Sequence, residues 1–242
     1  MANVINYQLS MFGKYNIIPS PDIISVLMKE INAVTKEIFL PNIINSQQIE
    51  IPTNKIVNVT NLAFITQDRK YSITVLNDRI DVNYTKVDDK NLEMHEFYSL
   101  AIDVFSAISK CDNIISNRLA MNIEQVCEVE SFSSLETKGR LLLQCPEYYK
   151  SKKFVEWGTH INSQIDIDIN HSKETLNVIT DISSAQNLIT QKAGVLFHID
   201  INTILQNQNM RFEVESLEIF VNNAQKIAKE LTMDVERLIV SE

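Results

Sequence analysis

The chain has 242 residues, of which 45% are hydrophobic, and its formal net charge is −9 with an isoelectric point near 5.0. This composition excludes a disordered chain, because it supplies enough apolar surface for a buried core. The acidic balance and the scattered Lys and Arg residues argue against nucleic-acid binding, which requires many basic groups to neutralise phosphates.

Cysteine usage and hydropathy indicate the compartment. Cys111, Cys127 and Cys145 are odd in number and form no Cys-x-x-Cys pair, as is common in a reducing environment. No window reaches the roughly 18 uninterrupted apolar residues of a membrane helix, and residues 1–18 lack the pattern of a signal peptide. We therefore expect a cytoplasmic protein without a membrane partner.

The first elements in chain order are a strand and a helix. Residues 4–18 alternate apolar and polar side chains, which predicts a strand. Ser20-Pro21-Asp22 then predicts a helix start, because Ser accepts a bond from a free amide and Pro fits the first turn. We expect this helix to run to about Phe39 and to end at Pro41.

Short strands and a second helix complete the first half. The polar connections between the strands are typical of antiparallel hairpins. The predicted strands cover residues 49–51 with 55–59, then 62–66, 71–76 and 79–84. A helix over 92–111, capped by Asn91 or by the Asp pair before it, has an apolar stripe at helical spacing.

The second half begins with a strand over 118–130 and a helix over 135–143, in which Gly139 weakens the helical pattern. Four more strands are predicted over 154–160, 164–170, 175–183 and 194–202. A helix over 214–231 follows, and a separate short helix begins at Thr232 or Asp234. In the last strand Val195, Phe197, Ile199 and Ile201 face one side, which predicts that this side is buried.

Both halves therefore show the order β-α-β-β-β-β-α, with a boundary between residues 115 and 116. We predict an α+β protein built by internal duplication, with an N-terminal half over 1–115 and a C-terminal half over 116–242, each an antiparallel sheet backed by helices. This order is that of the TATA-binding-protein-like folds. Shared topology carries no function by itself.

Several motifs resemble an uncharacterised bacterial family whose members are described as sporadically distributed. The resemblance covers about Tyr7 to Leu238. It is carried by the segments Leu62–Asp68, Tyr71–Val75, Asp78–Ile80, Arg118–Asn122, Val195–Thr203 and Thr232–Leu238. The family pattern has an Arg-Tyr-Ile-Asn type strand, of which only Arg118 and Asn122 are present here. The family has no assigned reaction, so the resemblance implies only an accessory setting such as phage defence or toxin control.

The chain contains no recognisable catalytic motif. Its four glycines are too dispersed for a phosphate-binding loop, and it has no Gly-x-Ser-x-Gly sequence. The four histidines show no metal-ligand spacing, although His198 shares a strand face with Asp200. We expect no catalytic residue, no metal and no cofactor, and hence no enzyme.

The segment from Glu147 to Trp157 is the first candidate site. We predict that Tyr148, Tyr149, Lys152, Lys153 and Trp157 bind a partner protein, because aromatic side chains beside cations are typical of interface hot spots. The alternative is a lysine-solvated loop whose Phe154 and Trp157 enter the core.

A second candidate site comprises Arg118, Asn122 and His198, which we predict to contact a small ligand. The alternative is that Arg118 lies at the rim of the sheet.

Together these features predict a non-catalytic cytosolic protein-interaction or regulatory protein, which the family resemblance places in a bacterial defence or toxin-control system. The alternative is a small-ligand or nucleotide sensor with a pocket between sheet and helices. The sequence leaves the partner protein and the oligomeric state open, a homodimer included.

Overall fold

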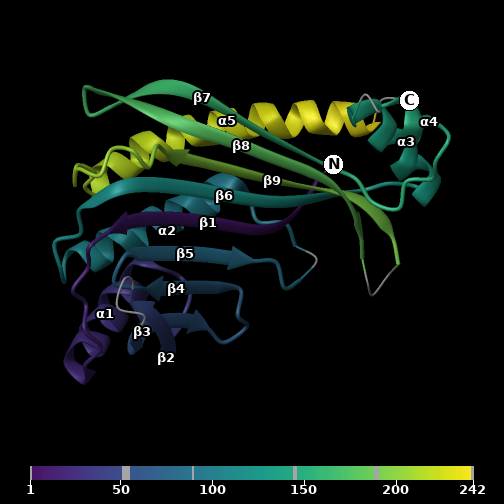
Figure 1. The fold of residues 1–242 in the computed structure, drawn as a ribbon. Helices are drawn as coiled ribbons and strands as arrows, with labels where there is room; N and C mark the ends of the chain where they lie inside the picture. Colours follow the sequence, from purple (N-terminus) through teal and green to yellow (C-terminus); the bar gives the residue numbers. More distant parts are fainter. Residues whose placement is uncertain (1, 51–54, 89, 144–145, 188–190, 241–242) are drawn as a thin grey trace.

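Nine antiparallel strands form one sheet in the computed structural model, which describes residues 2–50, 55–88, 90–143, 146–187 and 191–240. The strand order is β2-β3-β4-β5-β1-β6-β9-β8-β7 (Figure 1). With five helices among these residues the chain is an α+β protein, as predicted.

The first part of the chain supplies five strands and two helices. They are β1 (Asn3–Gly13), α1 (Pro21–Val34), β2 (Phe39–Glu50), β3 (Lys55–Thr66), β4 (Tyr71–Val75), β5 (Arg79–Thr85) and α2 (Met94–Ser109). The second part supplies β6 (Ser116–Glu128), α3 (Phe132–Leu143), α4 (Glu147–Lys150), β7 (Gly158–Ile169), β8 (Ser172–Gln186), β9 (Ala193–Thr203) and α5 (Val214–Val240).

The two parts meet at the centre of the sheet, where β1 pairs antiparallel with β6. Leu9 lies opposite Met121, and both side chains are fully buried. β5 flanks β1 on one side, and β9 flanks β6 on the other. Strands far apart in the sequence therefore share one core, in which each needs the other's apolar side chains.

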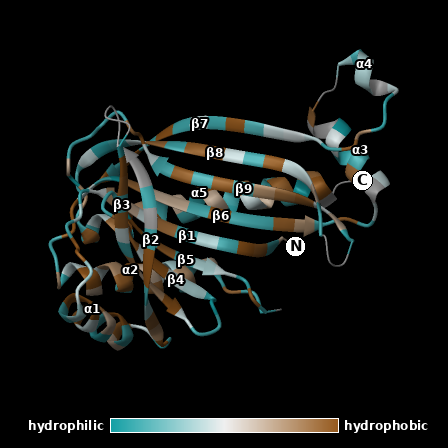
Figure 2. Ribbon diagram, turned by 60° about the horizontal axis from the view of Figure 1, so that its bottom comes forward, coloured by the Kyte–Doolittle hydropathy of each residue, from teal (hydrophilic) through white to brown (hydrophobic). Residues whose placement is uncertain are grey.

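The helices α2 and α5 lie on the same face of the sheet (Figure 2). α2 contacts β1 and β5, and α5 contacts β6, β7 and β9. Every second side chain of β9 points toward them. Val195, Phe197, Ile199 and Ile201 are fully buried there, which confirms the predicted orientation of this strand. The opposite face carries mostly polar side chains.

Aromatic rings fix α2 against the centre of the sheet. The ring of Tyr7 on β1 stacks on that of Phe97 with centroids 5.4 Å apart. Tyr98 donates its hydroxyl to the carbonyl oxygen of Asn122 on β6 at 3.1 Å. α2 begins at a capping box between Glu93 and Glu96, so the expected cap at Asn91 or the preceding Asp pair was wrong.

The first helix ends earlier than predicted. The Ser20 hydroxyl caps it by accepting from the Ile23 amide, but its last residue is Val34. The Phe39 amide donates to the side-chain oxygen of Asn32 at 2.9 Å, and Phe39 begins β2. Pro41 therefore lies in an edge strand, where its missing amide hydrogen is tolerated.

The second part departs further from the predicted order. Residues 158–169 form one uninterrupted strand, β7, so three strands follow α3 and α4 where four were predicted. Residues 161–163, which separated two of the predicted strands, lie inside β7. α5 also continues through Thr232, whose hydroxyl bonds to Gln125 at 3.1 Å, without a separate terminal helix. The boundary between residues 115 and 116 stays a prediction.

Among the described residues, no helix has the length and apolar composition required to cross a membrane.

We predict that Leu9→Ala lowers the free energy of unfolding by about 2–5 kcal/mol, the usual cost of truncating a fully buried leucine. Trp157, the only tryptophan, lies in the second part of the chain. Its fluorescence midpoint should therefore fall together with the far-UV circular dichroism midpoint, because β1 and β6 share one core. Leu205→Ala, at a side chain that is 61% exposed, is the control. An unchanged Trp157 midpoint would show that the two parts unfold independently.

Candidate functional site

Trp157 packs between α3 and the start of β7. Its indole Nε1 donates to the carbonyl oxygen of Leu135 at 3.1 Å, and its amide donates to the Ser184 hydroxyl at 3.0 Å. The ring occupies the space beside Gly139, where an added Cβ would come within 2.5 Å of it. The glycine that weakened the helical pattern thus admits the tryptophan, which is only 6% exposed.

Arg140 holds the segment after α4 against α3. Its guanidinium donates to the carbonyl oxygens of Tyr149, at 2.9 Å, and of Lys152, and lies 4.6 Å from the ring centroid of Phe154. It also pairs with Glu136 at 2.6 Å, and this hydrogen bond lowers the pKa of the carboxyl. The same Glu136 oxygen accepts from the Phe154 amide at 3.3 Å. This network shapes the candidate site.

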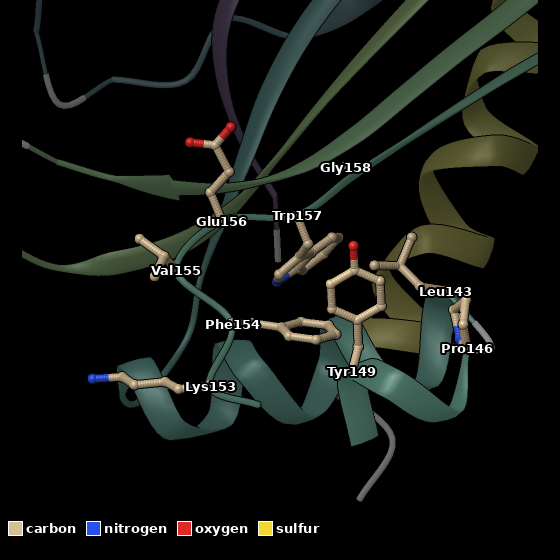
Figure 3. A pocket seen from close by; sticks show the side chains of 9 residues that line it. All are labelled: Leu143, Pro146, Tyr149, Lys153, Phe154, Val155, Glu156, Trp157 and Gly158. Atoms are coloured by element: carbon tan, nitrogen blue, oxygen red, sulfur yellow. The ribbon is translucent and has the colours of Figure 1, made fainter. Parts of the chain in front are cut away.

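The result is an open hollow of about 610 Å³ between α3, α4 and the start of β7, which we call the aromatic hollow. Its lining residues are Leu143, Pro146, Tyr149, Lys153, Phe154, Val155, Glu156, Trp157 and Gly158. In Figure 3 the rings of Tyr149, Phe154 and Trp157 lie close together beside Leu143, whereas Val155, Lys153 and Glu156 point away from them.

Tyr148 and Lys152 lie beside the residues that line the aromatic hollow. Tyr148 is 70% exposed and meets Tyr149 edge to face, with centroids 5.1 Å apart. The Lys152 ammonium lies 5.5 Å from the Tyr148 ring. Val155 is 94% exposed. The five predicted partner-binding residues are thus gathered in one place, but Trp157 supports the site from inside, as the alternative interpretation of this segment expected.

The predicted ligand contacts lie elsewhere, on the open face of the sheet. Asn122 and His198 line a shallow hollow of about 140 Å³ together with Asn6, Gln8 and Glu124. The Asn122 side-chain amide donates to Gln8 across the central strands at 3.2 Å.

Arg118 does not line this hollow. Its guanidinium lies 4.8 Å from the ring centroid of Phe12. The structure therefore brings together only two of the three residues.

Two histidines converge on one carboxylate on the same face. His160 Nδ1 lies 2.6 Å from Asp181, and His198 Nδ1 lies 3.7 Å from its other oxygen. The sequence did not indicate this cluster, because it depends on the pairing of β7, β8 and β9. No group of three or more His, Cys, Asp or Glu side chains arranged for a metal occurs among the described residues.

The cysteines provide no activated thiol within the described part of the chain, and Cys145 lies outside it. Burial is the main cause that raises the pKa of Cys127 to about 11. Burial likewise raises the pKa of Cys111. A raised pKa lowers the thiolate fraction that a nucleophile requires.

Sequence reasoning missed Arg140 and Glu136, although both could have been found. They are spaced i,i+4 on a predicted helix, which is the spacing of a side-chain ion pair. Their contacts with residues 149–154 required the folded loop.

Comparison with known proteins found no match to a protein-family model, to a curated protein or to a solved structure.

We predict that Gly139→Ala destabilises the fold by about 1–3 kcal/mol, as overpacking does. Helix propensity alone predicts the opposite sign, a gain of roughly 1 kcal/mol. Displacement of the indole should shift Trp157 emission to longer wavelength. Thr137→Ala, at an exposed position of the same helix, is the control and should leave the emission unchanged. A stabilised Gly139→Ala variant would contradict the packing of Trp157 on α3.

We predict that Cys127 resists alkylation by iodoacetamide at pH 8 in the folded protein and reacts when the protein is denatured, as measured by peptide mass spectrometry. With a pKa of about 11, roughly one thiol in a thousand is ionised at pH 8. The pKa of Cys127 in the folded protein exceeds its ordinary value of 9.0. The neutral thiol therefore contributes its full share to the stability of the fold below pH 9, and this contribution is lost as pH rises through 11. Rapid labelling of folded Cys127 at pH 8 would contradict this environment.

Proposed function

We propose that the chain is a non-catalytic interaction protein that binds another protein through the aromatic hollow. The observation that carries this proposal is an open apolar hollow beside a highly exposed tyrosine and valine. Tyrosine and tryptophan clusters of this kind dominate binding energy at protein interfaces. Arg140 and Gly139 hold the aromatic residues in place before any partner arrives, which reduces the entropy lost on binding.

The chemistry of the site favours a partner that inserts one apolar side chain. Burial of a Leu, Phe or Met side chain contributes about 1.5–3 kcal/mol. Lys152 and Lys153 at the margin favour an acidic residue beside that side chain, because opposite charges at a rim steer association.

The alternative is a small-ligand sensor, and one observation favours it. The volume of about 610 Å³ falls within the range of small-molecule sites. It also moves the expected ligand away from Asn122 and His198, whose hollow of about 140 Å³ is smaller than that range. The openness of the aromatic hollow and its exposed margin favour the protein partner.

We propose that residues 1–115 and 116–242 arose by duplication and share a TATA-binding-protein-like topology. The support is that β1 and β6 lie side by side, and that each is followed by helical structure and by strands that return to its outer side. The second part has one strand fewer, which a loss after duplication would explain.

Only the sequence bears on the cellular compartment and the biological role. We propose a cytoplasmic accessory role in bacterial defence or toxin control, because the motifs resemble a sporadically distributed bacterial family and the cysteine pattern is typical of a reducing compartment.

The test is affinity capture of a partner from bacterial lysate, followed by titration of the purified pair. We predict that Val155→Asp raises the dissociation constant at least about tenfold, which is roughly 1.4 kcal/mol. This side chain is 94% exposed, so the fold should be unaffected.

Val87→Asp, at a half-exposed valine of the first part, is the matched control and should bind as the unaltered protein does. Equal affinities of all three proteins would place the interface elsewhere. Saturable quenching of Trp157 by a metabolite, without any captured protein, would favour the sensor.

A further inference from the structure

The outer edge of β7 pairs with no strand among the described residues, because β7 is the last strand of the sheet. It is 12 residues long and contains no proline. The other edge strand, β2, carries Pro41, which removes a backbone donor. An unblocked edge of this length is a template for pairing with another strand.

The inner pairing of β7 fixes which backbone groups point outward. The Trp157 carbonyl accepts from the Ser184 amide at 2.9 Å, and Gly158 lies opposite Ser183 in the next position. Backbone groups alternate along an antiparallel ladder. Ile161 and Ser163 therefore turn their amides toward β8, and His160, Asn162, Gln164 and Asp166 present theirs at the free edge.

The side chains of β7 are complementary to those of a second, antiparallel β7. With a two-fold axis at Ser163, Ile161 lies opposite Ile165 of the second copy. On the open face, Asn162 then meets Gln164 of the second copy. The axis must run perpendicular to the sheet, because only then do directly opposite side chains lie on the same face.

The charges are also compatible with this register. His160 meets Asp166 of the second copy, and Asp168 meets Gly158 of the second copy. Like charges directly opposite each other destabilise paired strands. Axes at Asp166 or at Ile167 would bring carboxylates face to face, whereas an axis at Ser163 avoids this.

The isoleucine side chains on the helix-bearing face of β7 differ in how much of each is exposed to solvent. Ile169 is buried beside α5, where Asn170 bonds to Ser216 at 2.9 Å. Ile161 and Ile165 remain 56% and 45% exposed. The proposed pairing would place these two side chains against each other in both symmetry-related positions, and so remove apolar surface from water.

We propose that two copies of the chain associate through β7 about a two-fold axis at Ser163, which extends the sheet across the dimer. This interface shares only Gly158 with the lining of the aromatic hollow. It stands whether or not that hollow binds a partner.

Cysteine cross-linking tests the register. Ser163→Cys places two thiols opposite each other in a non-hydrogen-bonded pair, with Cα atoms near 4.5 Å, close enough for a disulfide. Mild oxidation of the full-length variant should yield a covalent dimer.

Ile161→Cys should not cross-link to itself, because its opposite residue is 165, whereas mixed Ile161→Cys and Ile165→Cys proteins should cross-link. The unaltered protein controls for its three native cysteines. Efficient self-cross-linking of Ile161→Cys, or of Gln164→Cys in place of Ser163→Cys, would overturn the register.

Sedimentation tests the edge. The unaltered protein should sediment at micromolar concentration as a species of twice 27.7 kDa. Asn162→Pro removes an amide that faces away from β8, so the fold should persist, as Trp157 emission can verify. The variant should raise the dimer dissociation constant at least about tenfold. A monomer at all concentrations, or a dimer unaffected by Asn162→Pro, would overturn the proposal.

Discussion

The antiparallel pairing of β1 with β6 is the constraint on which the rest of the structure depends. It joins segments more than a hundred residues apart and places Leu9 and Met121 in the same buried layer. Without this pair the sheet would divide into β2-β3-β4-β5-β1 and β6-β9-β8-β7, and α2 and α5 would have no continuous surface to cover. Because α2 and α5 cover the same face, the opposite face and the β7 edge remain available for other contacts.

The aromatic hollow lies at the far end of this sheet, and a small number of contacts create it. Gly139 lets the Trp157 indole lie against α3, and Arg140 binds the carbonyl oxygens of the segment that follows α4. The buried tryptophan supports the exposed aromatic residues, and the ion pair with Glu136 fixes the arginine. A surface organised before binding retains more of the contact energy, which is why support inside the protein matters as much as exposure outside it.

The elements that could be predicted from the sequence are those decided by interactions between residues close together in the chain. The helix start at Ser20, the hairpins between β3, β4 and β5, and the buried side of β9 depend on local periodicity and capping, and they were predicted. The errors occurred where distant contacts override local signals. Pro41 is accommodated because β2 is an edge strand, and α5 passes through Thr232 because that residue bonds to β6. Neither the edge position of β2 nor the contact between Thr232 and β6 can be recognised in the sequence.

The sequence by itself determined the α+β class, the acidic surface, the gathering of aromatic and basic residues in 147–157, and the lack of recognisable catalytic motifs. Only the tertiary structure decided that the Trp157 side chain is buried and the Tyr148 side chain exposed, and that Arg118 is apart from Asn122 and His198. It also decided that the outer edge of β7 pairs with no strand among the described residues. The physical reason is that composition and periodicity are properties of neighbouring residues. Burial, strand order and edge exposure arise only when residues distant in the chain are brought into contact.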